Sequence, residues 1–321
     1  MQRGAYGANV HDLQRRLAAA EVPVSDDPPG EFGPQTEAAV RDFQRRRGLR
    51  IDGVCGPQTW SALVEAGYRL GDRLMYRRRP MLRGDDVAEL QQRLGALGFD
   101  TGRVDGIFGD DTASALSDFQ RNVGLTADGI LGHSTLDELY RIQARSQGPE
   151  LVSDVRERET LRRGPRTLQG RRIALGEQGG LGAAVATIAR ALTGAGADVV
   201  DLHHPDGSRQ AADANGVAAE VYLGLLLDPT ANGCASSYYG GSRYESPGGR
   251  RLAELVQETV PAQLSVPDRG THRMSLPVLR ETRMPAVVCE LGPPMMLVER
   301  SHDLAHAVRE ALDTWVRAAW D

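Results

Sequence analysis

The chain has 321 residues, of which 40% are hydrophobic and 25% are charged, a composition typical of soluble globular proteins. Its net charge is −5, and its 38 basic residues are all arginines spread along the chain, which argues against a dedicated nucleic-acid-binding protein. No run approaches the roughly 18 apolar residues of a membrane-spanning helix. The length predicts about two domains.

The first residues and the cysteines predict the compartment. The segment from Met1 to Tyr6 lacks the apolar stretch of a secretory signal, so we expect a cytoplasmic protein. Cys55, Cys234 and Cys289 are odd in number and far apart in the sequence. They predict free thiols in a reducing compartment, without a disulfide framework, and Cys234 is expected in a loop.

Two segments in the first half of the chain repeat each other. The matching residues keep one spacing after a single one-residue gap, and the pairs include Val10/Val87, Leu13/Leu90, Leu17/Leu94, Phe32/Phe108, Thr36/Thr112, Phe43/Phe119, Gln44/Gln120, Gly53/Gly129 and Leu63/Leu139. So many matches at one spacing indicate a duplicated unit. We place the two copies at residues 1–70 and 71–145.

Each copy is predicted to form a small three-helix module. In the second copy, Val87, Leu90 and Leu94 recur at helical spacing, and Gly98 ends that helix. The strings GEFGPQTEAAVRDFQRRRGLRIDGVCGPQTWSAL and VDGIFGDDTASALSDFQRNVGLTADGILGHSTLDEL resemble the family of peptidoglycan-binding modules. The resemblance implies binding of peptidoglycan or muropeptides, although most of the shared residues are of types that serve turns and packing.

A further domain is expected after a charged linker at residues 146–170, which contains one short helix. Across residues 171–321, apolar strands alternate with helices. The strands are predicted at 173–175, 198–202, 221–227 and 286–289, and the helices near 183–194, 208–219, 248–260 and 302–319. This order predicts an α/β domain with a mixed sheet flanked by helices.

Two segments of this last domain resemble the zinc-dependent N-acetylmuramoyl-L-alanine amidases. ANGVAAEVYLGLLLD, at 214–228, aligns with the family strand that ends in Ser-Ile-His-Ala-Asn, and VLRETRMPAVVCELG, at 278–292, with the strand that delivers the catalytic glutamate. The resemblance implies that two His and one Glu hold zinc, that zinc activates a water molecule, and that a glutamate transfers the proton. The bond cut in that family joins the lactyl group of muramic acid to the stem peptide.

The positions that the resemblance assigns to zinc ligands carry other residues in this chain. Gln178 replaces the first His, Leu226 replaces the second, and Leu181 lies near the position of the ligating Glu, whose loop is missing. Since glutamine is a poor zinc ligand and leucine is none, we expect no bound zinc. Glu290 corresponds to the catalytic acid, which is not expected to act alone. The candidate ligand-binding residues are Glu290, Glu177, Arg269 and Arg283.

Two other patterns admit more than one interpretation. His203 and His204 are expected just past a strand end, so a replacement metal site there stays open, although adjacent side chains on a strand point to opposite faces. The arginine runs at 45–47 and 77–79 predict either a solvated surface or a site that captures phosphate or carboxylate.

The domain order, and segments such as RMPAVVCELG at 283–292, also resemble the actinobacterial CwlM group of cytoplasmic proteins. That group is associated with control of peptidoglycan precursor synthesis. We therefore expect a catalytically inactive amidase homologue that binds a muropeptide or precursor, or that regulates cell-wall synthesis through protein partners. An active amidase with a non-standard metal site and a structural adaptor without a small-molecule ligand are the alternatives.

Overall fold

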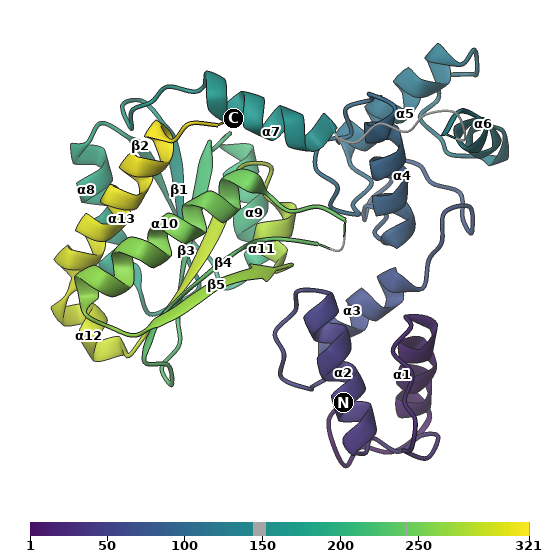
Figure 1. The fold of residues 1–321 in the computed structure, drawn as a ribbon, viewed down its shortest axis with the longest axis horizontal. Helices are drawn as coiled ribbons and strands as arrows, with labels where there is room; N and C mark the ends of the chain where they lie inside the picture. The colour runs from purple at the N-terminus through teal and green to yellow at the C-terminus, as the bar shows by residue number, and fades with distance from the viewer. Residues whose placement is uncertain (144–151, 242, 321) are drawn as a thin grey trace. The chain divides into compact units, whose positions relative to one another are not determined.

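Residues 1–143, 152–241 and 243–320 are described by a computed structural model (Figure 1). The chain divides into two units, Met1–Val155 with Ser242–Tyr244, and Arg156–Gly241 with Glu245–Asp321. Residues 146–151 of the expected linker lie outside the described residues, and its remainder includes a helix, α7, at Val152–Arg163.

The first unit contains two sets of three helices, as the repeat predicts. Their bounds are Ala8–Ala19 (α1), Pro34–Arg46 (α2), Pro57–Ala66 (α3), Asp85–Ala96 (α4), Asp110–Asn122 (α5) and His133–Gln143 (α6). Each set surrounds its own apolar core, and residues that match between the repeats take equivalent places, as Phe43 and Phe119 do. Both side chains are almost completely buried, which explains why the same residue type recurs.

A buried glutamine ties a loop to its helix at four places in these modules. In α5, Gln120 Nε2 donates to Asp128 Oδ1 (2.9 Å), Ile130 O (3.0 Å) and Thr135 Oγ1 (3.1 Å), while its Oε1 accepts from Gly129 N (2.9 Å). The other glutamines that bond a loop in this way are Gln14, Gln44 and Gln91. Because buried polar groups need partners, the Gln, Asp-Gly and Thr positions shared by the repeats have a structural role.

The second unit is built on a six-stranded sheet in the order β2-β1-β3-β6-β4-β5. The strands are Arg172–Glu177 (β1), Asp198–His203 (β2), Val221–Leu227 (β3), Gly233–Tyr239 (β4), Asp268–Met274 (β5) and Ala286–Gly292 (β6). Strands β2, β1, β3 and β6 are parallel to one another, and β4 runs antiparallel to β6 and parallel to β5. The expected mixed sheet is therefore confirmed.

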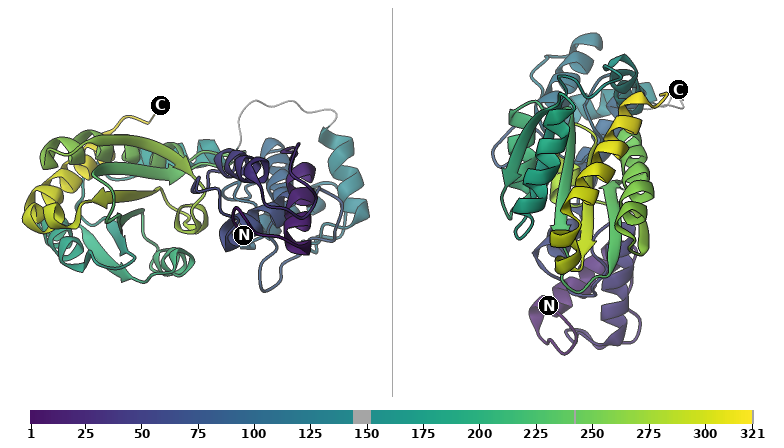
Figure 2. Two further views of the ribbon diagram at one scale, coloured as in Figure 1. Left: turned by 90° about the horizontal axis from the view of Figure 1, so that it is seen from below. Right: turned by 90° about the vertical axis from the view of Figure 1, so that its left-hand side faces the viewer.

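Helices cover both faces of the sheet. They are Gly182–Gly194 (α8), Gly207–Gly216 (α9), Pro247–Leu264 (α10), Pro277–Glu281 (α11), Pro294–Glu299 (α12) and Ser301–Arg317 (α13). Leu175 and Leu223 pack into one core with α8, α10 and α13, of which α10 and α13 lie side by side (Figures 1 and 2). Tyr222 points to the opposite face, where its hydroxyl donates to Gln210 of α9.

Two strands and two short helices were not predicted from the sequence. Strand β5 lies at the edge of the sheet and is mostly exposed and polar, so it lacks an apolar pattern. The prediction that Cys234 lies in a loop is wrong, because it is a buried residue of β4. Among the described residues, no helix has both the length and the apolar composition needed to cross a membrane.

Candidate functional site

The residues that align with the zinc site of the amidases lie along one edge of the sheet. Strands β2, β1, β3 and β6 all end there, and the carboxyl edge of parallel strands is where α/β proteins hold their ligands. Leu226 is the register partner of Glu290, and Glu177 is the partner of Leu225. Gln178 directly follows Glu177, the last residue of β1, so it lies at the same edge of the sheet as the Leu226–Glu290 pair of β3 and β6.

The side chains at the three positions that the resemblance assigns to zinc ligands do not fit a zinc ion. Gln178 is exposed, Leu226 is half-buried, and Leu181 is 4% exposed at the start of α8, packed in the main core of the sheet domain. Zinc needs nitrogen, sulfur or carboxylate ligands, which two leucines cannot supply. Within the described part of the chain, no three His, Cys, Asp or Glu side chains form a group that could hold a metal ion.

Glu290 is engaged by a second carboxyl group that the sequence analysis did not single out. Asp228 directly follows β3 and is hydrogen-bonded to Glu290. The hydroxyl of Thr230 (2.7 Å) and its N–H (2.9 Å), together with Glu290 and the N–H of Ala231, lower the pKa of Asp228 to about 2. The two carboxyl groups therefore lie together at this edge of the sheet, where β3 and β6 end.

The two arginines proposed as ligand contacts lie at opposite ends of the sheet. Arg269, in β5, lies at the same edge as Glu290, with its Nη1 4.0 Å from Asp228 Oδ2. Arg283 precedes the first residue of β6, and its backbone N–H donates to Asn215 Oδ1 at 2.9 Å. The structure thus brings Glu290 and Arg269 together at one edge and places Arg283 away from them.

Glu177 forms a second polar cluster at this edge, with His203 at the end of β2. Glu177 Oε1 accepts from His203 Nδ1 at 3.0 Å, and its Oε2 accepts from the N–H groups of Gly179 (2.8 Å) and Leu181 (3.1 Å). Burial opposes ionisation of Glu177, yet these bonds outweigh it and hold its pKa below the usual 4.5. The carboxylate thereby fixes the loop in which the amidase family carries its first His.

The two histidines do not act as a pair. The ring of His203 bonds to Glu177, whereas Nδ1 of His204 accepts from the N–H of Asp206 at 3.0 Å. Their separate partners agree with the expectation that adjacent strand residues point apart. A signal for the Glu177–His203 contact was present in the sequence, because both residues end neighbouring parallel strands.

Cys234 and Cys289 are separated in sequence but adjacent in the sheet. They lie on the paired strands β4 and β6, with their sulfur atoms 3.3 Å apart, and both are fully buried. The hydrogen bond with Cys234, followed by burial, raises the pKa of Cys289 well above its usual value. A buried thiol with a raised pKa is a poor nucleophile, so this pair does not supply an alternative catalytic group.

Comparisons with known proteins agree with this architecture. Residues 6–63 and 83–139 match the peptidoglycan binding domain family, and residues 183–295 match the N-acetylmuramoyl-L-alanine amidase family. The N-acetylmuramoyl-L-alanine amidase CwlM of Mycobacterium tuberculosis is 37% identical over 318 residues, covering 90% of this chain and 78% of that relative. The amidase CwlL of Bacillus licheniformis is 33% identical over 43% of this chain and 44% of its own length.

Among solved structures, the amidase Ami1 from Mycobacterium smegmatis aligns with 47% of this chain and 98% of its own, at 15% identity and a TM-score of 0.40. The identity to CwlM extends over most of both chains, through the helical modules and the sheet domain. The chain therefore belongs to the N-acetylmuramoyl-L-alanine amidase family.

Proposed function

We propose that this chain is a catalytically inactive member of the family that binds peptidoglycan fragments or precursors and regulates cell-wall synthesis through protein partners. The observation that carries the proposal is the chemistry of the three side chains at the positions assigned to zinc ligands. Gln178, Leu181 and Leu226 stand where a zinc amidase needs two His and one Glu, and Leu181 is committed to the core.

The state of Glu290 supports the same proposal. In the amidases, the resembling glutamate must accept and deliver a proton beside the zinc-bound water. Here Glu290 is hydrogen-bonded to Asp228, and the neighbouring positions carry Gln178 and Leu226, which would not hold a zinc ion beside it. Without a zinc-bound water molecule, Glu290 has no reactant from which to take a proton.

The binding part of the proposal rests on both units. The helical modules belong to a peptidoglycan-binding family. In the sheet domain, Arg269, Asp228 and Glu290 place a cation and two carboxyl groups at one edge, which can pair with the carboxylates and amines of a stem peptide. The cytoplasmic location expected from the sequence is part of the same proposal.

A cleavage and binding experiment on the full chain tests this function. We would incubate it with a soluble disaccharide–pentapeptide and zinc, follow release of the pentapeptide by mass spectrometry, and use an active zinc amidase as the positive control. We expect no release above the buffer blank, together with saturable binding in calorimetry. Zinc-dependent release would establish the active amidase instead, and absence of any binding would favour the structural adaptor.

A variant locates the part of the ligand that the sheet domain holds. Glu290→Ala is expected to weaken binding of the free pentapeptide about tenfold, because it removes one member of the carboxyl pair. Arg283→Ala is the matched control, since Arg283 lies beyond the other end of β6 and should leave the affinity unchanged. Equal affinities of the Glu290→Ala variant and the unaltered protein would remove the peptide site from this edge.

A further inference from the structure

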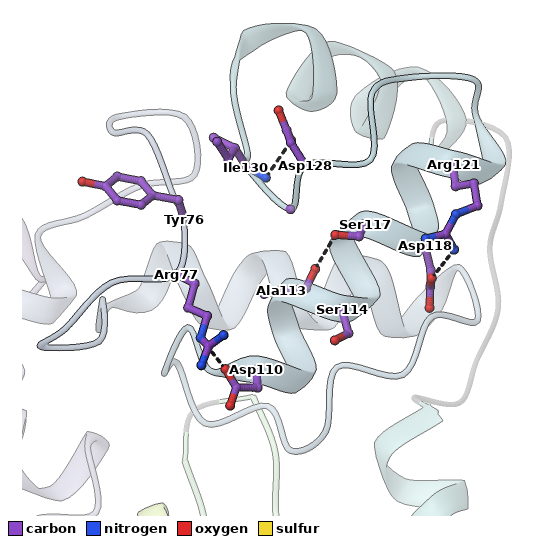
Figure 3. Close-up of a pocket in the computed structure, with 11 residues that line it drawn as sticks. Tyr76, Arg77, Asp110, Ala113, Ser114, Ser117, Asp118, Arg121, Asp128 and Ile130 are labelled. Carbon is purple, nitrogen blue, oxygen red and sulfur yellow. Dashed lines mark hydrogen bonds and ion pairs between the residues drawn. The ribbon is translucent and has the colours of Figure 1, made fainter.

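The second helical module has an open groove along α5, whereas the equivalent place in the first module is filled. The groove encloses about 500 Å³ beside the exposed side of α5, between the segment that precedes α4 and the loop that follows α5 (Figure 3). Its lining includes Tyr76, Arg77, Asp110, Ser114, Ser117 and Asp128.

Two residues close the equivalent place in the first module. Glu37 and Arg41 of α2 correspond in the repeat to Ala113 and Ser117 of α5. Arg41 Nη2 lies 3.0 Å from Glu37 Oε1, and its Nη1 donates to Ile51 O at 3.0 Å. This ion pair covers Gly53, where an added Cβ would lie 2.8 Å from Arg41 Nε.

The second module lacks this ion pair because the corresponding side chains are small. An added Cβ at Gly129, which matches Gly53, would lie nearest to Ser117 Oγ, at 3.0 Å, and to the backbone carbonyl oxygen of Ala113, at 3.3 Å. Ser117 Oγ donates to Ala113 O at 3.1 Å and stays close to the helix. Alanine and serine therefore leave open the space that the ion pair occupies in the first module.

The segment that precedes α4 supplies the other wall. Met75 and Leu131 exchange backbone hydrogen bonds, as Met1 and Cys55 do at the start of the first module. From there, the second module has a longer segment before α4, which carries the arginine run at 77–79. Arg77 Nε lies 2.6 Å from Asp110 Oδ1 at the start of α5, a position that is proline in the first module.

The groove carries a net negative charge, because three aspartates and two arginines line it. Arg77 is paired with Asp110. Arg121 is paired with Asp118, and Arg121 Nη1 lies 2.6 Å from Asp118 Oδ1. The N–H of Ile130, together with Gln120, lowers the pKa of Asp128, so it remains ionised. With both guanidinium groups already paired, the groove favours an uncharged polar ligand over a phosphate group.

The remaining groups suit a sugar. Ser114 and Ser117 provide hydroxyls, and the paired aspartates and arginines provide acceptors and donors at either side. Tyr76 is 40% exposed and Ile130 is 36% exposed, so both offer apolar area at the mouth of the groove. A ring with polar edges and apolar faces can use both kinds of contact, as ligands in such clefts do.

We propose that this groove of the second module binds the N-acetylated sugars of peptidoglycan, and that the first module does not bind sugar at its equivalent position. The proposal rests on the function proposed above, because it presupposes a chain that binds peptidoglycan fragments. It adds the module, the wall residues and the chemical class of the ligand.

The test uses the full chain and a trisaccharide of N-acetylglucosamine, titrated by NMR and by calorimetry. The variant Ala113→Glu with Ser117→Arg installs the ion pair of the first module and should weaken binding about tenfold or more. Its fold is expected to persist, because the first module carries the same pair on the same scaffold. The reciprocal variant, Glu37→Ala with Arg41→Ser, is the matched control. Because the first module has proline in place of Asp110 and a shorter segment before its first helix, it still lacks the second wall, and this variant should bind one trisaccharide with unchanged affinity.

Tyr76→Ala provides a second variant that does not touch a helix, and it should weaken binding about fivefold. Unchanged affinity in the closed-groove variant would overturn the proposed site. A chain that binds the disaccharide–pentapeptide but not the trisaccharide would overturn the ligand class while leaving the proposed function intact. A chain that binds neither would overturn both.

Discussion

The helical modules and the sheet domain place their family residues in different physical settings. In the modules, the motif residues lie in the interior. The side-chain amide of Gln120, for example, donates a hydrogen bond to Thr135 Oγ1 and accepts one from the N–H of Gly129. In the sheet domain, two of the positions that the family resemblance assigns to zinc ligands, Gln178 and Leu226, lie at strand ends outside the core. Residues that hold a fold together must keep their chemistry, whereas residues that serve only a reaction can lose it without unfolding the domain.

Leu181 is the exception among the ligand positions, and changing it should have the largest effect. Leu181→Glu would restore the residue type of the amidases but bury a carboxyl group in the core, costing about 4 kcal/mol of unfolding free energy. Leu181→Met conserves volume and should cost less than about 1.5 kcal/mol. Urea unfolding followed by tryptophan fluorescence is suitable, since Trp315 is buried in the same core. Equal stability of the two variants would show that this position is not part of the core.

Gln120 of α5 provides the corresponding test for the buried motif residues of the helical modules. Gln120→Leu should destabilise the second module by about 3 kcal/mol, because it leaves Gly129 N and Thr135 Oγ1 without their partner. Amide hydrogen exchange at Gly129 reports this module alone and should become faster. Asp118→Ala, on the exposed side of α5, is the control and should change stability by less than about 0.5 kcal/mol. Persistent protection of Gly129 in Gln120→Leu would contradict a structural role for the motif.

Substitution of Glu177 should have an intermediate effect on the free energy of unfolding, and this effect should depend on pH. Glu177→Gln is expected to cost about 1–2 kcal/mol at pH 7, since the carboxylate accepts from His203, Gly179 and Leu181. Its folded-state pKa lies below 4.5, so the contribution is complete above that pH and is lost as the pH falls through the lower value. Unfolding measured at pH 7, 5.5 and 3.5 checks the trend. A difference that grew on acidification would contradict it, and the exposed Glu299→Gln is the control.

The smallest effect on stability is expected at Gln178, the exposed one of the three positions assigned to zinc ligands. Gln178→His should change stability by less than about 0.5 kcal/mol, because the side chain is exposed. A single imidazole still leaves two leucines at the other ligand positions, so zinc should not raise the melting temperature of this variant. A zinc-dependent rise would reveal ligands from elsewhere in the chain.

Much of this architecture could be predicted from the sequence, because duplicated motifs and apolar strands leave periodic patterns. The prediction missed β5, whose polar residues suit an exposed edge, and β4, whose serines, alanine and tyrosines show no simple alternation. At the site, the family resemblance indicated Glu290 and Arg269 as candidate ligand-binding residues, but it did not place them at one edge of the sheet. The bond from Glu290 to Asp228 depends on how the chain turns after β3, which no motif encodes.

Direct measurement of zinc affinity tests the central claim, that the amidase scaffold persists here without its metal ligands. The full chain would compete with a chelating dye for zinc at pH 7. We expect no stoichiometric site with a dissociation constant below the order of 1 µM. One zinc ion per chain held more tightly than this, and retained on gel filtration, would contradict it.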